Sequence, residues 1–407
     1  MNADFQRWVD KWVGVPLCFL LTLVKRGAGL FNKGGQRNHP PRRILFILLS
    51  ENGALILAGH AVELARKRFP EATLFFLTST LGCEILDLMG QIDPENVMGI
   101  STKSPVSFFH SSLGAVRFLR HNQIDTTVNL ETFARFSTLL AFLSGASRRV
   151  GFSRFHDEGR YLGDLTTHKV IYNPHLHAAS SYQALVEAIA EPADGEPLVK
   201  KAIGALDFKP RPRPIAPNAR EQMLSLIKEL YPPLRQDTRL VILNPNASDI
   251  IPARCWPAEH FAALARGLLE DASLLVVLTG SPEERPKTER LRGIINSKRV
   301  VNLAGMTTLT TLVDLFDLGS LLVTNDSGPA HFATLTEIPI IVLFGPETPK
   351  LFGPLGLKAE VIYQGLACSP CVSAYNQKKS PCSDNLCLKN IAPAAVLAVA
   401  QRLLGKS

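Results

Sequence analysis

The sequence has no apolar run that is long enough to cross a bilayer. Its N-terminal part contains twelve mostly apolar residues at positions 13–24, whereas a membrane-spanning helix needs about 20. A secretory signal is not expected either, because Lys25 and Arg26 follow the run directly and no small-residue cleavage site comes after it. These absences argue against a transmembrane protein and against export.

Net charge is also scarce outside the N-terminal segment. Eight basic and only two acidic residues fall within positions 1–43, so this segment carries +6 of the chain's formal charge of +8. The body of the chain is therefore nearly neutral, which argues against a nucleic-acid-binding protein. We expect no nucleic-acid partner.

The basic segment, residues 1–42, has the composition of a helix that lies in a membrane interface. It combines the apolar run with Trp8 and Trp12, which suit the headgroup level, and with cations that attract anionic lipids, each contributing roughly 1 kcal/mol near the surface. The alternative is a helix that packs against the main body, although Pro16 weakens any helix there. We expect peripheral attachment to a membrane surface.

The seven cysteines are too few for a disulfide scaffold in a chain of 407 residues. Four of them lie in one short stretch with the spacing C-x2-C-x10-C-x4-C, and four thiolates suit a closed, tetrahedral zinc site of structural type. Reduced free thiols, an iron–sulfur centre and a disulfide are alternatives for the same residues. The candidate metal ligands are Cys368, Cys371, Cys382 and Cys387.

Short apolar runs alternate with amphipathic stretches through most of the chain, as strands and helices do in a parallel α/β sheet. The alternation starts near Arg43, stops at a cluster of six prolines between residues 190 and 217, and then starts again. Such a density of proline marks a linker. The pattern predicts a membrane-interface segment at 1–42, a Rossmann-like domain at 43–190, a linker at 191–217, a second Rossmann-like domain at 218–390 and a closing helix at 391–407.

Two doubly wound domains of this kind are expected to face each other across a cleft, in the α/β arrangement called GT-B. The closing helix is expected to return to the first domain. GT-B proteins include nucleotide-sugar transferases and some epimerases, so the architecture does not decide the chemistry.

The most informative motif is Asn-Asp-Ser-Gly-Pro-Ala-His at 325–331, which follows a strand-like run and would open a helix. Backbone N–H groups at a helix N-terminus, with a hydroxyl and an imidazole beside them, are suited to holding phosphates. The alternative is that the first polar side chains only cap the helix and that the histidine is an ordinary helix residue. The candidate phosphate-binding residues are Asp326, Ser327, Gly328, Pro329 and His331.

This motif and its neighbours resemble glycosyltransferase family 9, the bacterial ADP-heptose:lipopolysaccharide heptosyltransferases. The family carries Asp-Ser/Thr-Gly-Pro-x-His and then a strand that ends in Leu-Phe-Gly-Pro, and both stand here at the same spacing, at 326–331 and 343–346. The resemblance covers roughly residues 43–404 and is closer in the second domain. It implies that donor phosphates meet Ser248 and Arg254, beside Asn246. The family usually has Lys at the position of Arg254 and Gly at the position of Asn246. The resemblance also implies that Glu283 or Glu284 binds ribose hydroxyls.

The same resemblance reveals a missing residue in the first domain. The family's aspartate, the expected general base for the acceptor hydroxyl, corresponds to Ala54, and an alanine cannot accept a proton. A carboxylate or imidazole within hydrogen-bond reach of the nucleophile has to replace it. The candidates, which lie at predicted strand ends or on the following helix, are Glu51, Glu131 and His60, with Glu51 the first choice.

The resemblance implies an inverting, metal-independent transferase that moves a heptose or a related sugar from a nucleotide-diphosphate donor such as ADP-heptose. The acceptor would be a lipopolysaccharide core or another lipid-linked saccharide, which places the protein in the cytoplasm at the inner face of the bacterial inner membrane. No cofactor is expected for catalysis. The alternatives are a nucleotide-sugar-binding protein impaired by Ala54 and a nucleotide-sugar epimerase of the same fold.

Overall fold

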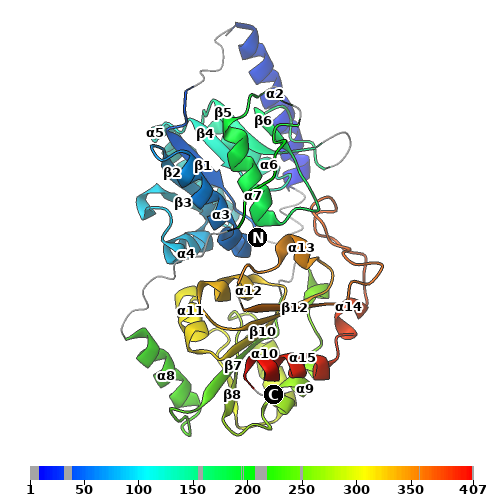
Figure 1. Cartoon of the computed structure of the whole chain (residues 1–407). Coiled ribbons are helices and arrows are strands. Elements are labelled where there is room, and N and C mark those ends of the chain that lie inside the picture. The colour runs from blue at the N-terminus through cyan, green and yellow to red at the C-terminus, as the bar shows by residue number, and fades with distance from the viewer. Residues whose placement is uncertain are drawn as a thin grey trace. The chain divides into compact units, whose positions relative to one another are not determined.

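The computed structural model describes residues 9–31, 39–154, 159–193, 195, 197–206, 218–247, 251–356 and 358–405. The chain forms two compact domains, Met1–Lys209 and Pro210–Ser407, whose boundary falls inside the predicted linker (Figure 1). Each domain contains one six-stranded sheet in which all strands pair in parallel. The prediction of two doubly wound α/β domains is therefore confirmed.

The sheet of the first domain has the strand order β3-β2-β1-β4-β5-β6. Its central strands, β1 (Arg43–Ile47) and β4 (Thr126–Asn129), are almost entirely buried, as strands covered on both faces are. The strand order reverses between these two strands, which is where open α/β sheets bind ligands. The other elements are α2 (Gly14–Phe31), α3 (Asn52–Arg68), β2 (Thr73–Ser79), α4 (Thr80–Met89), β3 (Val97–Ile100), α5 (Pro105–His121), α6 (Arg135–Leu143), β5 (Arg148–Ser153), β6 (His168–Ile171) and α7 (Ala178–Glu187).

Helices cover both faces of this sheet. On one face α3 packs against α7, and on the other α5 and α6 cover a core that includes Leu45, Leu119 and Leu140. The N-terminal helix α2 packs beside α6, with Cys18 buried against Leu139. Within the part of the chain that the structure describes, no helix combines the length and the apolar character needed to cross a membrane.

The sheet of the second domain has the order β12-β11-β10-β7-β8-β9, which repeats the arrangement of the first sheet. Its order reverses between β7 (Arg239–Asn244) and β10 (Leu321–Asn325). The other elements are α8 (Ala219–Leu230), α9 (Ala258–Leu268), β8 (Leu274–Leu278), α10 (Arg285–Ile295), β9 (Val300–Asn302), α11 (Leu309–Leu318), α12 (Gly328–Phe332), β11 (Ile340–Phe344), α13 (Pro349–Phe352), β12 (Ala359–Tyr363), α14 (Leu386–Lys389) and α15 (Pro393–Leu403).

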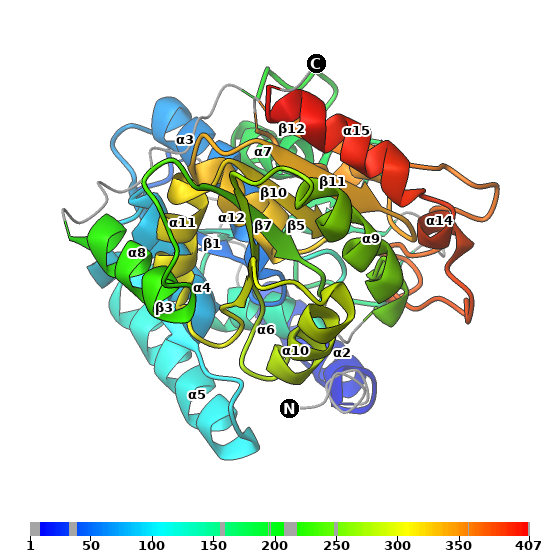
Figure 2. The ribbon, with the colours of Figure 1, turned by 90° about the horizontal axis from the view of Figure 1, so that it is seen from below.

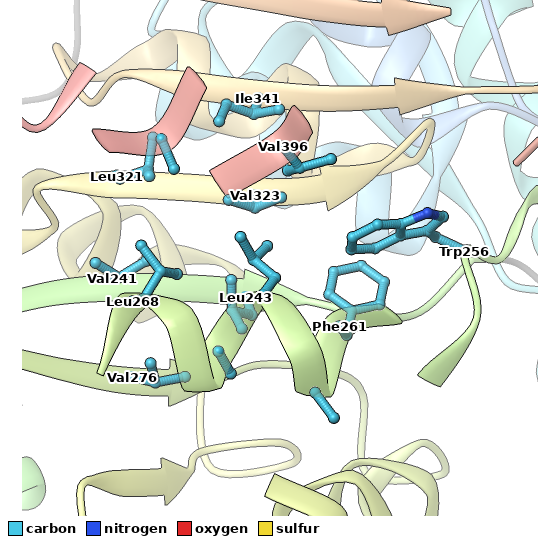
Figure 3. Close-up of a cluster of buried hydrophobic side chains, with 14 of the residues drawn as sticks. Val241, Leu243, Trp256, Phe261, Leu268, Val276, Leu321, Val323, Ile341 and Val396 are labelled. Atoms are coloured by element: carbon cyan, nitrogen blue, oxygen red, sulfur yellow. The ribbon is translucent and has the colours of Figure 1, made fainter. Parts of the chain in front are cut away.

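The closing helix α15 belongs to the second domain, which corrects the expectation that it returns to the first. Figure 3 shows Val396 of this helix beside Val323 and Ile341 of the central strands, and Trp256 and Phe261 in the same apolar cluster. All of these side chains are buried. The apolar face of α15 is therefore part of the core that supports the carboxyl ends of β7 and β10.

Candidate functional site

The turn between β10 and α12 contains the predicted phosphate-binding motif. Ser327 is the N-cap of α12 and has extended backbone, but its side chain does not cap the helix. Its hydroxyl instead donates to the carbonyl oxygen of Asn325 at 3.2 Å. A Cβ on Gly328 would lie 3.1 Å from the ring of Phe332, so the absence of a side chain lets the helix keep this ring close. The capping role considered for Ser327 is not what the structure contains.

Asp326, the other residue of this turn, faces the guanidinium of Arg254. Arg254 Nε lies 3.3 Å from Asp326 Oδ2, and its Nη2 lies 2.6 Å from Glu347 Oε2. Both carboxylates are buried, with Asp326 5% and Glu347 3% exposed. Because two carboxylates surround one cation, the group carries one net negative charge before any ligand arrives.

Glu347 was not predicted from the sequence, although one signal was present. It follows Leu-Phe-Gly-Pro at 343–346 directly, and a carboxylate just beyond the end of a central strand lies at the ligand-binding edge of a parallel sheet. Its Oε1 atom is buried and has no hydrogen-bond partner among the residues that the structure describes. Such a buried acceptor is costly unless a donor reaches it.

Arg254 is held in place by its neighbours in the chain. It ends the short 3-10 helix η3 (Pro252–Arg254), and Trp256, two residues later, is buried in the apolar core (Figure 3). The backbone N–H of Trp256 donates to Asn325 Oδ1 at 3.0 Å, and its indole N–H donates to the carbonyl oxygen of Ile391 at 3.0 Å. The aromatic anchor therefore fixes the position of the guanidinium against β10.

A chain of amide hydrogen bonds extends the site from β10 to β8. Asn325 Nδ2 donates to the carbonyl oxygen of Asn246 at 3.2 Å, and Asn246 Nδ2 donates to the carbonyl oxygen of Thr279 at 3.1 Å. Gly280 permits this approach, because a Cβ there would stand 2.5 Å from Asn246 Nδ2 and 3.0 Å from Glu284 Oε2. Asn246 and Glu284 therefore lie close together, as the predicted donor site requires.

The two glutamates proposed for ribose differ in their surroundings. Glu284 is partly buried and accepts a hydrogen bond from the backbone N–H of Ser281 at 2.7 Å. Glu283 is exposed, and hydrogen bonds to its own backbone and to Ser281 lower the pKa of its carboxyl. Glu284 is the better placed of the two. Ser248 lies outside the described residues.

His331 and Pro329 complete the motif within α12. Pro329 occupies the first turn of the helix, where a missing N–H is tolerated, and His331 is buried in the same five-residue helix. The structure thus brings Asp326, Arg254 and Glu347 into direct contact and keeps Ser327 and His331 on the adjoining turn. The guanidinium, the hydroxyl and the imidazole at this strand end can all donate to an anion, and the two carboxylates beside Arg254 oppose its binding.

The corresponding edge of the first domain is dominated by Glu131. Its Oε1 accepts hydrogen bonds from the backbone N–H groups of Leu49 and Ser50 at 2.6 and 2.7 Å, and its Oε2 accepts one from the Ser50 hydroxyl at 2.7 Å. Burial raises the pKa of this carboxyl above its ordinary value, and the hydrogen bonds offset only part of that rise. Glu131 thus fixes the loop that follows β1, which is a positioning role.

Glu51 stands next in this loop, at the N-cap of α3 with extended backbone. It is only partly buried, and its negative charge is close enough to raise the pKa values of Glu131 and of the buried Tyr182. Ala54 and His60 are both buried within α3. Of the three predicted bases, Glu51 combines accessibility with a position at the switch point. Tyr182, on α7, was not predicted from the sequence.

Two of the four clustered cysteines, Cys371 and Cys387, lie against the loop that carries Glu347. The backbone N–H groups of Cys371 and Val372 donate to the carbonyl oxygen of Pro346 at 3.0 and 3.1 Å, and a Cβ on Gly345 would meet Cys387 Sγ at 3.0 Å. On the other side, Asn385 Nδ2 donates to the carbonyl oxygens of residues 253 and 255, both at 2.9 Å. This segment therefore supports both sides of the contact between Arg254 and Glu347.

The thiols themselves are not arranged as a ligand set. Among the described residues, no group of three or more His, Cys, Asp or Glu side chains is placed to hold a metal ion. Cys371 Sγ lies 3.1 Å from the Ser380 hydroxyl, and Cys382 donates to the carbonyl oxygen of Asp384. Burial, followed by the nearby charges of the other three cysteines, raises the pKa of Cys387. The thiols thus lie near one another, and bound zinc stays a prediction.

Comparison with known proteins places this geometry in a family. The model of glycosyltransferase family 9 (heptosyltransferase) matches residues 115–380. Lipooligosaccharide heptosyltransferase 2 of Campylobacter jejuni is 30% identical over 176 residues, which are 43% of this chain and 54% of that protein. The chain thus matches about half the length of this curated relative.

Solved structures show the same fold. The ADP-heptose lipopolysaccharide heptosyltransferase II of Escherichia coli superposes with a TM-score of 0.67 at 22% identity, covering 89% of this chain and 98% of that one. The heptosyltransferase WaaC of Escherichia coli, solved with ADP, gives a TM-score of 0.60 at 16% identity and covers 89% and 99% of the two chains. These likenesses confirm the GT-B fold. With a family model that covers well over half of its length, the chain belongs to glycosyltransferase family 9, the heptosyltransferases.

Proposed function

We propose that the protein is an inverting transferase that moves a heptose or a related sugar from ADP-heptose, or a similar nucleotide sugar, to a lipopolysaccharide core or another lipid-linked saccharide. Membership of the heptosyltransferase family supports this function, as does the ADP in the solved structure of WaaC. The work would take place at a membrane surface, with the N-terminal segment against the lipid.

The observation that carries the proposal is the position of Arg254 beside the Asp326–Ser327 turn, at the strand switch point of the second domain. Glycosyl transfer leaves negative charge on the departing diphosphate, and preorganised cations and N–H or O–H donors stabilise that charge. Arg254 would supply the cation, and Ser327 and His331 would supply further donors. Catalysis by these groups needs no metal ion.

Glu51 is our candidate for the general base in the first domain. Glu131 is engaged by three hydrogen bonds, and His60 is buried within α3. Glu51 is partly buried at the N-cap of α3, four residues beyond the end of β1, from which a carboxylate can take a proton from an acceptor hydroxyl.

A second candidate function is a nucleotide-sugar-binding protein without transferase activity. It is favoured by one observation: the family's base position is Ala54, buried in α3, and the nearby carboxylate of Glu131 already accepts backbone hydrogen bonds. Such a protein would bind the donor and neither transfer nor hydrolyse it.

The first experiment is a thermal-shift series with ADP, UDP and GDP on the wild type, on Asp326→Ala and on the control Asp317→Ala, whose side chain is exposed on α11. A ligand at about 100 times its dissociation constant should stabilise the fold by about 2.7 kcal/mol. We expect ADP to stabilise the wild type and the control. It should lose its effect on Asp326→Ala, because alanine removes the acceptor that positions the Arg254 guanidinium. Stabilisation by none of the nucleotides would refute the proposed donor site.

Transfer is then measured with ADP-heptose and a lipid-linked saccharide acceptor, following the release of ADP. ADP release that requires the acceptor supports the transferase. Donor binding without ADP release, with or without the acceptor, supports the binding protein instead. Metal analysis of the purified protein tests the separate prediction of zinc at the four cysteines.

A further inference from the structure

Three helices on one face of the first domain share an unusual composition. α5, α6 and α2 lie side by side, with α6 in the middle (Figure 2): the rings of Phe108 and Phe136 join α5 to α6 at 4.8 Å, and Cys18 joins α2 to the buried Leu139 of α6. None of the three helices contains an aspartate or a glutamate. We call this surface the acid-free face.

The helices on the opposite face of the same sheet have ordinary charge. α3 contains Glu63, α4 contains Glu84 and Asp87, and α7 ends in Glu187. The charged side chains of the helices of the acid-free face are all basic. Lys25 and Arg135 pair with Asp164 and Asp10 of other segments, and the exposed ones are Arg26, Arg117 and Arg120. The asymmetry therefore separates the two faces of one domain.

The acid-free face also exposes large apolar side chains. Phe109 on α5 is 67% exposed and Val24 on α2 is 61% exposed. Of the 17 exposed large hydrophobic residues among those described, ten lie on α5, on α2 or immediately before α2. Soluble monomeric proteins rarely expose large apolar patches. The ten are Trp12, Val13, Leu17, Phe19, Leu20, Leu23, Val24, Val106, Phe109 and Leu113.

Polar contacts hold α2 in this orientation. Lys25 donates to the carboxylate and the backbone oxygen of Asp164, whose own N–H donates to the Thr22 hydroxyl at 2.9 Å. A Cβ on Gly163 would lie 2.7 Å from the carbonyl oxygen of Cys18, so glycine allows the loop to meet the helix. The Asp10 carboxylate pairs with Arg135 of α6. These contacts hold the polar side of α2 against the domain, so the apolar side of the helix faces outward.

We propose that the acid-free face binds the surface of an anionic lipid bilayer, with the outer sides of α2 and α5 inserted at headgroup level. Apolar side chains gain from burial at the acyl boundary, and the exposed Arg26, Arg117 and Arg120 are attracted to anionic headgroups. A second copy of the chain fits less well, because two such faces would bring like charges together. The inference extends the proposed function, whose lipid-linked acceptor would lie in the same membrane.

The new element of this inference is α5, which begins more than 60 residues beyond the basic N-terminal segment, residues 1–42, in the sequence. The test therefore uses the pair Val106→Ser/Phe109→Ser in the full-length protein. The matched control is Leu230→Ser/Val361→Ser, two exposed apolar residues of the second domain. Because all four side chains are exposed, melting temperatures should stay near that of the wild type.

Binding is measured by co-sedimentation with vesicles of phosphatidylcholine alone and of equal parts phosphatidylcholine and phosphatidylglycerol. We expect the wild type and the control to bind the anionic vesicles. The affinity of the α5 pair for these vesicles should be lower by a factor of about ten or more. Arg117→Glu, which adds an acid to this face, should weaken binding to anionic vesicles by roughly threefold or more. Equal binding by the α5 pair and its control would overturn the proposal, as would equal binding to neutral and anionic vesicles.

Sedimentation without lipid tests the competing occupant. A concentration-dependent dimer of the wild type that the α5 pair abolishes would assign this face to a second copy and overturn the proposal. The ADP thermal shift is measured on the same samples. Vesicle binding without an ADP response would refute the proposed donor site and leave the membrane inference standing. An ADP response without vesicle binding would refute the membrane inference and leave the donor site standing.

Discussion

The strand switch points of the two domains share one device and differ in its chemistry. In each domain, a polar side chain at or just beyond the end of one central strand forms hydrogen bonds with the backbone that follows the other central strand. In the second domain Asn325 Nδ2 donates to the carbonyl oxygen of Asn246. In the first, Glu131 accepts the N–H groups of Leu49 and Ser50.

This difference bears on which ligand each edge can hold. A buried carboxylate at the first edge repels phosphate and leaves a site suited to a neutral hydroxyl acceptor. The neutral amide at the second edge leaves the charge of the site to Arg254 and its two carboxylates. Both edges contain buried carboxylates, but among the described residues only those of the second edge contact a guanidinium, that of Arg254. This cation supports a donor site in the second domain and an acceptor site in the first.

The largest effect is expected from Glu51→Gln, which removes the candidate base and keeps the shape of the side chain. Loss of a general base lowers the rate by about 10²–10⁴-fold, while Glu71→Gln, an exposed glutamate of the same domain, should leave the rate unchanged. The measurement is the rate of ADP release from ADP-heptose with acceptor. An unchanged rate would remove Glu51 from the mechanism.

Arg254→Ala tests the other side of the comparison. The substitution leaves Asp326 and Glu347 buried without their cation, so we expect a loss of about 3–5 kcal/mol in the free energy of unfolding. ADP should no longer raise the melting temperature. Arg254→Lys keeps the charge and should recover most of the stability, as measured by urea unfolding. Full ADP affinity in the alanine variant would show that the phosphates bind elsewhere.

The first domain also contains a buried imidazole that makes its stability depend on pH. Burial, then the charges of Arg148 and Arg149, lowers the pKa of His168 to about 4 from 6.5. Below pH 6.5 His168 is protonated in the unfolded chain, whereas in the folded chain it stays neutral down to about pH 4. Its contribution to the free energy of unfolding is therefore fully present above pH 6.5 and is lost as the pH falls from 6.5 to 4. The loss is on the order of 3 kcal/mol.

Melting temperatures between pH 7 and 4.5 test this dependence, with His168→Gln as the comparison. The variant should show a shallower decline over that range. Parallel curves for the two proteins would mean that other groups set the acid sensitivity.

Glu131→Gln separates positioning from catalysis at the first edge. The amide has one acceptor oxygen where the carboxylate has two, so one of the donors at Leu49 and Ser50 loses its partner, at a cost of about 1–3 kcal/mol. Urea unfolding should show this loss, with a smaller decrease in rate than Glu51→Gln gives. A decrease as large as that of Glu51→Gln, without loss of stability, would instead make Glu131 the base.

The sequence predicted the elements whose apolar runs are strong. The apolar runs at 240–243, 274–278 and 340–343 coincide with β7, β8 and β11 to within one residue at each end. Five strands, β3, β5, β6, β9 and β12, were not predicted, because they are short or partly exposed and contain no long apolar run. The end of the chain was assigned to the wrong domain, since an amphipathic pattern does not say which core receives it.

The site was predictable where residues adjoin in sequence and not where tertiary packing brings them together. The turn at 326–331 was predicted as a phosphate-binding motif and stays a prediction, whereas the proximity of Arg254 that the family resemblance implied is seen in its contact with Asp326. Glu347 reaches Arg254 only because β11 pairs with β10 and the cysteine segment supports both loops. No local pattern encodes that meeting. Likewise, the hydrogen bonds that engage Glu131 depend on the pairing of β1 with β4.

The smallest effect is expected from Glu347→Gln, which tests whether this carboxylate competes with the donor. Glu347 Oε2 lies 2.6 Å from Arg254 Nη2, so the cation is partly neutralised before a diphosphate arrives. Replacing the carboxylate by an amide keeps a hydrogen-bond acceptor and removes the charge. ADP should then bind about 3- to 10-fold more tightly, or roughly 1 kcal/mol, as measured by calorimetric titration.

The opposite result has an equally definite meaning. Weaker ADP binding in Glu347→Gln would show that the carboxylate holds the guanidinium in its productive position, and that losing this support outweighs the gain in positive charge. Glu337→Gln is the control, because this glutamate is exposed and pairs only loosely with Lys358 at 3.6 Å. Its ADP affinity should equal that of the wild type, since charges this exposed are screened by solvent and salt. A difference confined to Glu347 would therefore tie the effect to Arg254 and not to the net charge of the domain.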